Sequence, residues 1–427
     1  MNRRIFLATA AAGAATALCG ANDRLRIALV GLRGRGRDHI KGFGPMPGVE
    51  IAVACDVDEA ILATRLDDIE KLTGRRPKGE IEYRRVLEDK SIDAVVIGTQ
   101  NHQHTLQTVW ACQAGKDVLV EKPCSHNIFE ARQIVAAARK YRRMVQHGTQ
   151  TRSAAAVREG IEQLRKGAIG DVYMARGLCF NFRDTIGRAQ PEAIPAGVHY
   201  DQWIGPAPLK PFTKNRFHYN WHWQWDYGNG DIGNQGVHEM DVARWGLGVK
   251  YPTRVSAMGG HFLFDDDQET PNTLSAQFEF DEGGAKKFLT FEVRHWITNV
   301  EAGMGGQAGV SAVGNVFFGR NGFMVREKLG YKTFLGKEHQ PGPAATSQEN
   351  HFENFVTAVR SRRPEDLNAE IEEGAITCTL IHLANISYRL GRSLRFDSKT
   401  MTCPGDAEAN ALFTRSYRAP YVVPEAV

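Results

Sequence analysis

The segment LRIALVGLRGRG, residues 25–36, decides the fold of the first half of the chain. Its first six residues form a short and almost wholly apolar run, which is typical of a strand buried on both faces of a parallel sheet. A glycine-rich turn and then a helical pattern follow directly. Such a turn lets backbone N–H groups and a helix N-terminus meet a pyrophosphate. The segment therefore predicts the first strand–helix unit of a dinucleotide-binding domain.

The turn matches part of the pattern G-x-G-x-x-G. Gly31 and Gly36 stand at the outer positions, but Arg33 replaces the middle glycine, which ordinarily lets the backbone approach the pyrophosphate closely. The Arg33 guanidinium can instead turn toward phosphate. We therefore expect the whole turn to contact the cofactor, through Gly31, Arg33, Gly34, Arg35 and Gly36.

The next apolar run, residues 49–55, ends at Asp56. A carboxylate at this point accepts hydrogen bonds from a ribose diol and repels a 2′-phosphate, so the sequence predicts NAD rather than NADP. Asp56 would alternatively cap the following helix, although Asp58 is also available for that role.

Short apolar runs and helical patterns alternate up to about Gly148. The predicted strands are 25–30, 49–55, 94–98, 118–120 and 144–146, and the helices between them include 59–72, 106–114 and 130–141. This alternation predicts an α/β fold with a doubly wound parallel sheet, the Rossmann arrangement.

The pattern changes after Gly148. A helix is predicted over 156–166, followed by longer, partly alternating runs at 172–180, 255–264, 273–280, 288–295 and 309–318, and by helices at 348–361 and 370–390. Because few helices separate the runs, we expect a mostly antiparallel open sheet in an α+β domain. A chain of 427 residues is too long for one ordinary core, so we divide it into domains at 24–148 and 149–427.

The composition excludes several classes of function. The formal net charge is only +4 and no dense Lys/Arg tract occurs, which argues against nucleic-acid binding. The 7 cysteines are scattered and none forms a C-x-x-C pair. The sequence therefore predicts no metal site and mostly buried, apolar roles for the cysteines.

The first 23 residues, MNRRIFLATAAAGAATALCGAND, have the layout of a twin-arginine export signal. Arg3 and Arg4 precede a weakly apolar, alanine-rich run that is too short to span a membrane well. The alternatives are an ordinary secretory signal or a frayed N-terminus. We expect a periplasmic or otherwise exported protein without a membrane segment after signal removal.

Two strand ends carry a family resemblance. The segments GTQNHQH, residues 98–104, and EKP, residues 121–123, resemble the T-P-N-x-x-H and E-K-P patterns of the glucose–fructose oxidoreductase / inositol dehydrogenase (Gfo/Idh/MocA) family, with Gln100 in place of the proline. Residues 203–206, WIGP, resemble the family's W-x-G-P turn. The resemblance covers nearly the whole chain after residue 23.

The segment GNGDIGNQGVHEMD, residues 228–241, resembles the family's D-x-G-x-H-x-x-D pattern. His238 and Asp241 match, whereas Asn234 stands where the family has an acid and Asp231 lies nearby but out of register. Asp241 is expected to be structural. Asn234 cannot take a proton, which puts a carboxylate–histidine relay in doubt.

The resemblance implies a nicotinamide enzyme acting on a sugar or polyol. Its cofactor contacts would include Thr99, Asn101, His104, Glu121 and Lys122, and its catalytic residues Lys122, His238 and Asn234. The chemistry is consistent, because a base and a cation both help to deprotonate a hydroxyl whose carbon gives up hydride. A surface lysine and a helix-capping histidine are the ordinary alternatives.

The segment FHYNWHWQWDY, residues 217–227, alternates aromatic and polar side chains, which is typical of a sugar-binding surface and equally of an edge strand. His218 and His222 would suit a metal pair only on a helix, which we do not expect there. The expected substrate contacts are Trp203, Trp221, His222, Asp231, Asn234 and His238.

Three functions remain open at this stage. The first is a sugar or polyol oxidoreductase with tightly bound NAD. The second is a redox-neutral, NAD-dependent glycoside hydrolase or lyase of the same superfamily, and the third a non-catalytic binding module. The resemblance also implies a homo-oligomer assembled through the open C-terminal sheet. The identity of the sugar and the direction of reaction are not encoded in these motifs.

Overall fold

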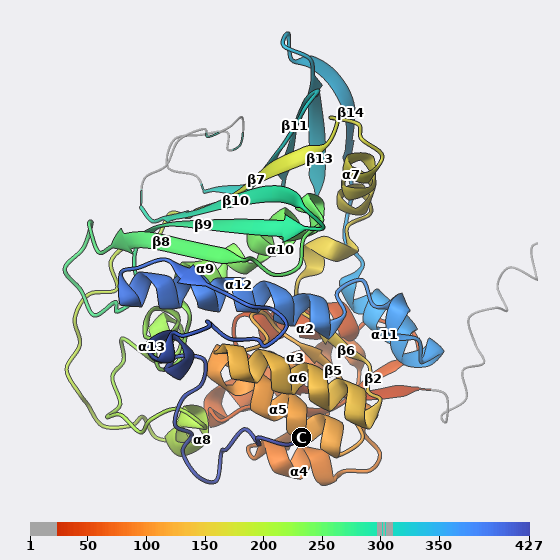
Figure 1. The fold of residues 1–427 in the computed structure, drawn as a ribbon. Coiled ribbons are helices and arrows are strands. Elements are labelled where there is room, and N and C mark those ends of the chain that lie inside the picture. The colour runs from red at the N-terminus through yellow and green to blue at the C-terminus, as the bar shows by residue number, and fades with distance from the viewer. Residues whose placement is uncertain (1–23, 297–300, 302–303, 305–310) are drawn as a thin grey trace, which may run out of the picture.

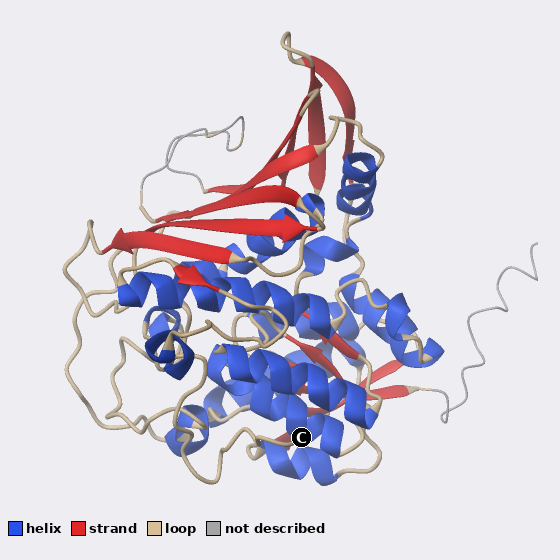
Figure 2. Cartoon of the chain, in the orientation of Figure 1, coloured by secondary structure: helices blue, strands red, loops and turns tan. Residues whose placement is uncertain are grey.

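The computed structural model describes residues 24–296, 301, 304 and 311–427 (Figure 1). The predicted export signal, residues 1–23, lies outside the described residues. A small parallel sheet flanked by helices forms one part of the molecule, and a large sheet forms the other (Figure 2). No helix in the described part of the chain is long and apolar enough to cross a membrane.

The first sheet has six strands in the order β3-β2-β1-β4-β5-β6, and every neighbouring pair is parallel. The strands are β1 (Leu25–Val30), β2 (Val49–Cys55), β3 (Lys78–Glu80), β4 (Ala94–Ile97), β5 (Asp117–Val120) and β6 (Val145–His147). The predicted doubly wound sheet is confirmed. The order reverses between β1 and β4, so the ligand crevice of such a sheet lies at their carboxyl ends.

Five helices cover the first sheet. They are α2 (Arg35–Phe43), α3 (Glu59–Thr73), α4 (Tyr83–Glu88), α5 (Asn101–Gln113) and α6 (Ile128–Tyr141). Helix α5 begins at Asn101, five residues before the predicted start at residue 106, so the polar motif at 101–104 forms its buried first turn.

The second sheet has nine strands in the order β14-β13-β12-β11-β7-β10-β9-β8-β15. They are β7 (Val172–Phe180), β8 (Arg254–Gly260), β9 (Thr273–Glu282), β10 (Ala285–Arg294), β11 (Ala312–Gly319), β12 (Gly322–Glu327), β13 (Gly330–Leu335), β14 (Gln340–Thr346) and β15 (Leu394–Arg395). Among the described strands of this sheet, only β7 and β10 are parallel neighbours. The predicted, mostly antiparallel sheet is therefore confirmed, and the β7–β10 pair brings the ends of two distant segments together.

The helical elements of the second part are mostly short. They are η1 (Gln150–Ser153), α7 (Ala155–Arg165), α8 (Tyr200–Ile204), η2 (Asn220–Trp223), α9 (Gly230–Asn234), α10 (Gly236–Leu247), α11 (His351–Ser361), η3 (Pro364–Asp366), α12 (Ile371–Leu390) and α13 (Ala407–Ala411). The 217–227 segment contains the 3₁₀ turn η2 and is not the edge strand considered from its alternation, because Trp221, Trp223 and Tyr227 pack inward.

Two helices join the parts. Figure 1 shows α12 lying between the large sheet and the Rossmann domain, and it packs on β8 on one side and on α6 on the other. Helix α11 returns to the first domain, where Phe355 and Val359 enter the same apolar cluster as Phe43. The carboxyl edge of the parallel sheet thus faces residues of the second part.

Candidate cofactor and active site

The β1–α2 turn has the shape that a pyrophosphate requires. Gly31 has φ +80°, and a Cβ atom there would lie 2.7 Å from the carbonyl of Gly98. A Cβ at Gly36 would lie 2.3 Å from the Gly31 carbonyl oxygen. Gly34 is the N-cap of α2, no side chain caps the helix, and the space in front of Gly34 is open within 4 Å. A helix N-terminus without a side-chain cap that faces open space fits a bound anion.

Asp56 closes the second strand as predicted, and its carboxylate organises the turn. Its Oδ2 accepts a hydrogen bond from the Leu32 N–H at 2.7 Å, and its Oδ1 accepts one from the Asp58 N–H at 3.0 Å. Asp58 is the residue that caps α3, by accepting from Ala60 and Ile61. Burial raises the pKa of Asp56, whereas the two backbone donors lower it.

A pocket opens at the carboxyl ends of β1, β2 and β4. Its lining includes Gly31, Asp56, Thr99, Trp110 and Tyr421. It lies at the reversal of strand order, where dinucleotides bind in such sheets. The glycine turn, the acid and the pocket together fit the nucleotide that the sequence predicts.

The T-x-N-x-x-H motif is held by hydrogen bonds within the protein. The His104 ring nitrogens lie 2.7 Å from the Pro123 carbonyl oxygen and 3.0 Å from that of Thr99. This ring therefore ties the end of β4 to the turn after β5. Asn101 donates from Nδ2 to Asn229 Oδ1 at 3.3 Å, which links the first domain to the loop before α9.

Glu121 anchors the glycine turn to the end of β5. Its Oε1 accepts a hydrogen bond from Arg35 Nε at 2.8 Å and lies 3.0 Å from His39 Nε2. Burial opposes ionisation of the carboxyl, but Arg35 and His39 hold the pKa of Glu121 well below its ordinary value. Arg35 is thus placed beside the turn by a buried carboxylate.

Lys122 points across the domain boundary toward α9. Its Nζ donates to the Asn234 carbonyl oxygen at 2.8 Å and to Asn234 Oδ1 at 3.2 Å. Burial lowers the pKa of Lys122, and the nearby Glu121 carboxylate partly opposes this shift. A half-buried lysine with a lowered pKa can exchange a proton near neutral pH more readily than a surface lysine.

Asp231 lies behind Asn234 and adds a further buried carboxylate to the site. Arg183 donates to its two oxygens at 3.1 and 3.0 Å, His295 Nε2 lies 3.2 Å away, and Asn234 Nδ2 donates to it at 3.4 Å. Burial alone would raise the pKa of Asp231, but Arg183 and His295 hold it well below its ordinary value. The negative charge of Asp231 is therefore balanced by the Arg183 guanidinium.

Arg183 and His295 were not predicted from any sequence motif. Arg183 follows β7, and His295 directly follows β10. The two strands are parallel neighbours, with Phe180 beside Arg294, so their carboxyl ends meet. Only the pairing of β7 with β10 would have pointed to these two residues.

His238 lies in the first turn of α10, which begins at Gly236. The ring is buried, and its Nδ1 has no hydrogen-bond partner in the described part of the chain. Burial, and then the neighbouring Lys122 ammonium, hold the pKa of His238 well below its ordinary value. The imidazole is therefore neutral and can accept a proton.

The aromatic residues fall into two groups. Trp203 is fully buried and stacks on Tyr200, with its ring centroid 5.5 Å away, so its ring presents no exposed face in this structure. Trp221 is also buried and stacks on His222 at 3.6 Å. The Nδ1 of His222 lies 2.5 Å from the Tyr219 carbonyl oxygen, and the ring is close enough to Lys122 and Arg183 for their charges to act on it. The predicted sugar contacts of these side chains stay predictions.

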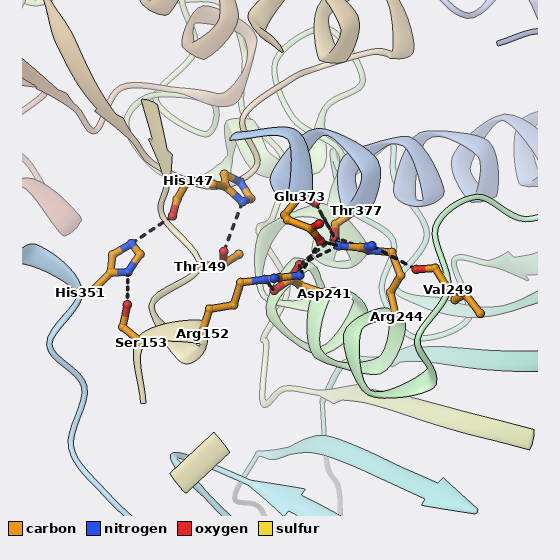
Figure 3. A network of polar contacts seen from close by, with 10 residues as sticks. All are labelled: His147, Thr149, Arg152, Ser153, Asp241, Arg244, Val249, His351, Glu373 and Thr377. Atoms are coloured by element: carbon orange, nitrogen blue, oxygen red, sulfur yellow. Dashed lines mark hydrogen bonds and ion pairs between the residues drawn. The ribbon is translucent and has the colours of Figure 1, made fainter. Parts of the chain in front are cut away.

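Asp241 belongs to a buried ion network, in keeping with the structural role expected from the sequence. Arg152 donates to its two oxygens at 2.6 and 3.0 Å, and Thr377 donates at 2.8 Å from α12 (Figure 3). Glu373 on α12 bridges Arg152 and Arg244. The network fixes α10, and with it His238, against α12 and the end of the Rossmann domain.

Comparison with known proteins gives the family. A model of an oxidoreductase family with an NAD-binding Rossmann fold (Gfo/Idh/MocA) matches residues 25–149, and its C-terminal alpha/beta domain matches 172–260 and 337–423. A glycosyl hydrolase family 109 protein of Shewanella baltica is 30% identical over 122 residues, which is 28% of this chain and 27% of that protein. The rhizopine catabolism protein MocA of Rhizobium meliloti is 26% identical over 222 residues, 52% of this chain and 57% of that protein.

Solved structures share the fold over most of the chain. The aldose-aldose oxidoreductase of Caulobacter crescentus has a TM-score of 0.66 at 18% identity, covering 87% of this chain and 100% of that one. The WlbA dehydrogenase of Bordetella pertussis, solved with NADH and UDP-GlcNAcA, has a TM-score of 0.63 at 17% identity, covering 88% and 99%. The chain belongs to the Gfo/Idh/MocA oxidoreductase family and carries its NAD-binding Rossmann domain.

Proposed function

We propose that this protein is an NAD-dependent oxidoreductase that transfers hydride between a sugar or polyol hydroxyl and a tightly bound nicotinamide cofactor. The observation that carries the proposal is the placement of a half-buried Lys122 near a buried, neutral His238 at the carboxyl edge of the parallel sheet. Ligands of such sheets collect at this edge.

The two residues have complementary roles. Bound nicotinamide supplies the hydride acceptor. The Lys122 ammonium donates a hydrogen bond from Nζ to the reacting hydroxyl oxygen, where negative charge develops. His238 accepts the hydroxyl proton on its neutral ring. Asn234 keeps Lys122 directed across the boundary between the domains.

Asp56 supports NAD over NADP. Its two oxygens each accept one backbone N–H, and a carboxylate oxygen can accept more than one hydrogen bond, so capacity remains for a ribose hydroxyl. A 2′-phosphate near this buried carboxylate would meet charge repulsion.

A redox-neutral glycoside hydrolase is the second candidate. The family 109 relatives favour it, and the match to the Shewanella baltica protein extends over 28% of this chain. In such a cycle a ring hydroxyl is oxidised, a neighbouring C–H becomes acidic enough for elimination, and the hydride then returns. The same Lys122 and His238 would serve both reactions.

We further propose export of the loaded protein through the twin-arginine pathway and assembly into a homo-oligomer. Arg3 and Arg4 support the first proposal, since that pathway carries folded proteins. An exported enzyme without a supply of free NAD would keep its nucleotide through many turnovers.

The experiment is to denature the purified full-length protein and identify the released nucleotide and its redox state. We expect near-stoichiometric NAD or NADH, and turnover of sugars in buffer without added nucleotide. If turnover requires a second sugar that accepts the hydride from the bound cofactor, the protein is an oxidoreductase. If it cleaves a glycosidic bond without any added hydride acceptor, it is the hydrolase.

The Lys122→Ala variant is the control, because it should retain nucleotide and lose turnover. Protein that is free of nucleotide and active only when NAD is supplied, with NADH accumulating, contradicts the bound-cofactor proposal. Protein that binds no nicotinamide nucleotide at all contradicts the oxidoreductase proposal itself.

A further inference from the structure

Three potential metal ligands meet behind the candidate active site. Cys124 follows the E-K-P turn, His147 ends β6, and Cys378 lies in the middle of α12. All three side chains are fully buried, and their ligand atoms lie within 4.8 Å of one another. The two cysteines are 254 residues apart in the sequence. Spacing rules therefore could not reveal the cluster, and the sequence predicted no metal.

The separation of the sulfur atoms fits a shared cation. Cys124 Sγ lies 3.7 Å from Cys378 Sγ. Two metal–sulfur bonds of about 2.3 Å at a tetrahedral angle place their sulfur atoms about 3.7 to 3.8 Å apart. A disulfide requires the sulfur atoms to lie about 2 Å apart, so the pair would have to move considerably to form one.

His147 is oriented as a ligand. Its Nδ1 lies 3.4 Å from Thr149 Oγ1, and its Nε2 is buried without a hydrogen-bond partner in the described residues. Figure 3 shows the ring beside α12, with Thr149 on one side of it. Metal-bound histidines commonly place the second ring nitrogen against an oxygen in this way.

Helix α12 leaves room for this ring. A Cβ atom at Gly374 would lie 2.5 Å from His147 Cγ, so glycine is needed for the ring to fit. Gly374, Cys378 and His382 follow at spacings of four and share one face of the helix. His382 also reaches the loop that carries Cys124, since its Nε2 lies 2.9 Å from Ser125 Oγ.

The charges of the cluster suit a divalent cation. Two buried thiolates with no cation would be costly. A divalent cation neutralises both, and thiolate with imidazole is the ligand set that zinc prefers.

We propose that Cys124, His147 and Cys378 bind one thiophilic divalent cation of the zinc type. The cation links the end of β6 and the loop after β5 to α12, and so clamps the Rossmann domain to the second part of the molecule. The proposal does not depend on the reaction catalysed. The role of the cation is structural, because a cation that binds only the folded chain increases the free energy of unfolding.

The test uses the full-length protein, reduced and freed of metal with a chelator. Titration with Co²⁺ should give one bound equivalent, with a thiolate-to-cobalt charge-transfer band and the visible spectrum of tetrahedral cobalt. Zn²⁺ should displace the Co²⁺ and raise the melting temperature. Protein purified without chelator should contain near-stoichiometric zinc by elemental analysis.

The variant Cys378→Ser should bind Co²⁺ at least tenfold more weakly and lose the charge-transfer band. Cys112→Ser is the matched control, since Cys112 is also fully buried but lies in α5 outside the cluster. It should bind Co²⁺ as the parent protein does. Circular dichroism of both variants without metal checks that they fold.

Three results would overturn the proposal. One is reduced, folded parent protein that takes up no Co²⁺. Another is a Cys378→Ser variant that binds Co²⁺ as tightly as the parent. The third is recovery of Cys124 and Cys378 as a disulfide from protein purified without reductant, which would make the pair a covalent link instead of a metal site.

Discussion

Asn234 is an amide placed between a lysine and a carboxylate. Its Oδ1 accepts from Lys122 while its Nδ2 donates to Asp231, so each end of the amide faces the partner that suits it. Asn234 stands where the family has an acid, and Asp231, three residues earlier in the chain, is already paired with Arg183. The amide adds no charge next to Lys122, whose pKa burial lowers.

The first prediction concerns Lys122. The Lys122→Ala variant should lower turnover by about 10²-fold or more, the scale of a lost partner for a developing oxyanion. Affinity for NAD should change little, because Arg35, Glu121 and the glycine turn remain. Steady-state kinetics and calorimetry measure the two effects. Lys90→Ala, at an exposed position in the same domain, is the control, and equal turnover in both variants would remove Lys122 from the mechanism.

The second prediction concerns Asp231. Because Arg183 and His295 hold the pKa of Asp231 below its unfolded value, the folded chain gains stability above about pH 4 and loses it as pH falls through the folded pKa. Asp231→Asn leaves Arg183 without its anion and should cost about 3 kcal/mol at neutral pH.

Urea unfolding at several pH values measures this cost. The difference in unfolding free energy between parent and variant should be constant above about pH 5 and shrink below about pH 4. Asp67→Asn, at an exposed acid, serves as the control. A difference that does not change down to about pH 2 would show that Asp231 does not stabilise through its charge.

At the scale of single residues, the sequence motifs identified groups that reach across the domain boundary. Lys122 and Asn234 are in contact, and the charge of Lys122 acts on His238. Arg183 and His295 were missed, because they belong to no local pattern and meet Asp231 only through the pairing of distant strands. When a site is assembled from the ends of several strands, its residues can be predicted from the sequence only where each strand end carries a recognisable motif.

At the scale of elements, the strength of the local pattern decided what could be predicted. The predicted bounds of β1, β2 and β7 agree with the structure to the residue, because apolar runs between breakers define them. Strand β3 was missed because it has three largely exposed residues at a sheet edge. The strands from β12 to β15 were missed as well, and β14 carries mostly exposed residues without alternation.

The third prediction belongs to the β1–α2 turn. Gly36→Ala would place a methyl group 2.3 Å from the Gly31 carbonyl oxygen, a backbone atom that can move only if the turn opens. We expect NAD binding to weaken at least tenfold by calorimetry.

Gly74→Ala is the matched control for this turn. Gly74 also has a positive φ, of +72°, but it lies at the end of α3 in open space. Its substitution should cost only about 1 kcal/mol of stability. It should leave NAD binding unchanged. Equal binding by both variants would show that the turn does not hold the nucleotide.

At the scale of the whole molecule, the division at residue 148 follows the sequence, but helices from after residue 148 also pack against the Rossmann domain. Helix α11 comes from the second half of the chain but enters the apolar cluster of the Rossmann domain. Helix α12 is buried between the two parts. A periodicity pattern predicts such helices but not their neighbours, so the extensive contact between the parts could not be predicted from sequence.

The large sheet has two different faces. Phe317 on β11 is fully buried and meets α10 at Gly246. Phe318, Phe323 and Phe334 are directly paired across β11, β12 and β13, so they share the opposite face and are only partly buried. They line a broad apolar hollow, and hollows of this kind on a sheet face are typical of subunit contacts.

The last prediction is that this face joins copies of the chain. The parent protein should elute at the mass of an oligomer by size-exclusion chromatography with light scattering. Phe334→Glu should shift it toward a single chain, because an unpaired carboxylate in an apolar contact is costly. Phe262→Glu is the control, since Phe262 is 71% exposed and lies outside this hollow. A parent protein that elutes as one chain, or an oligomer that Phe334→Glu leaves intact, would place any assembly elsewhere.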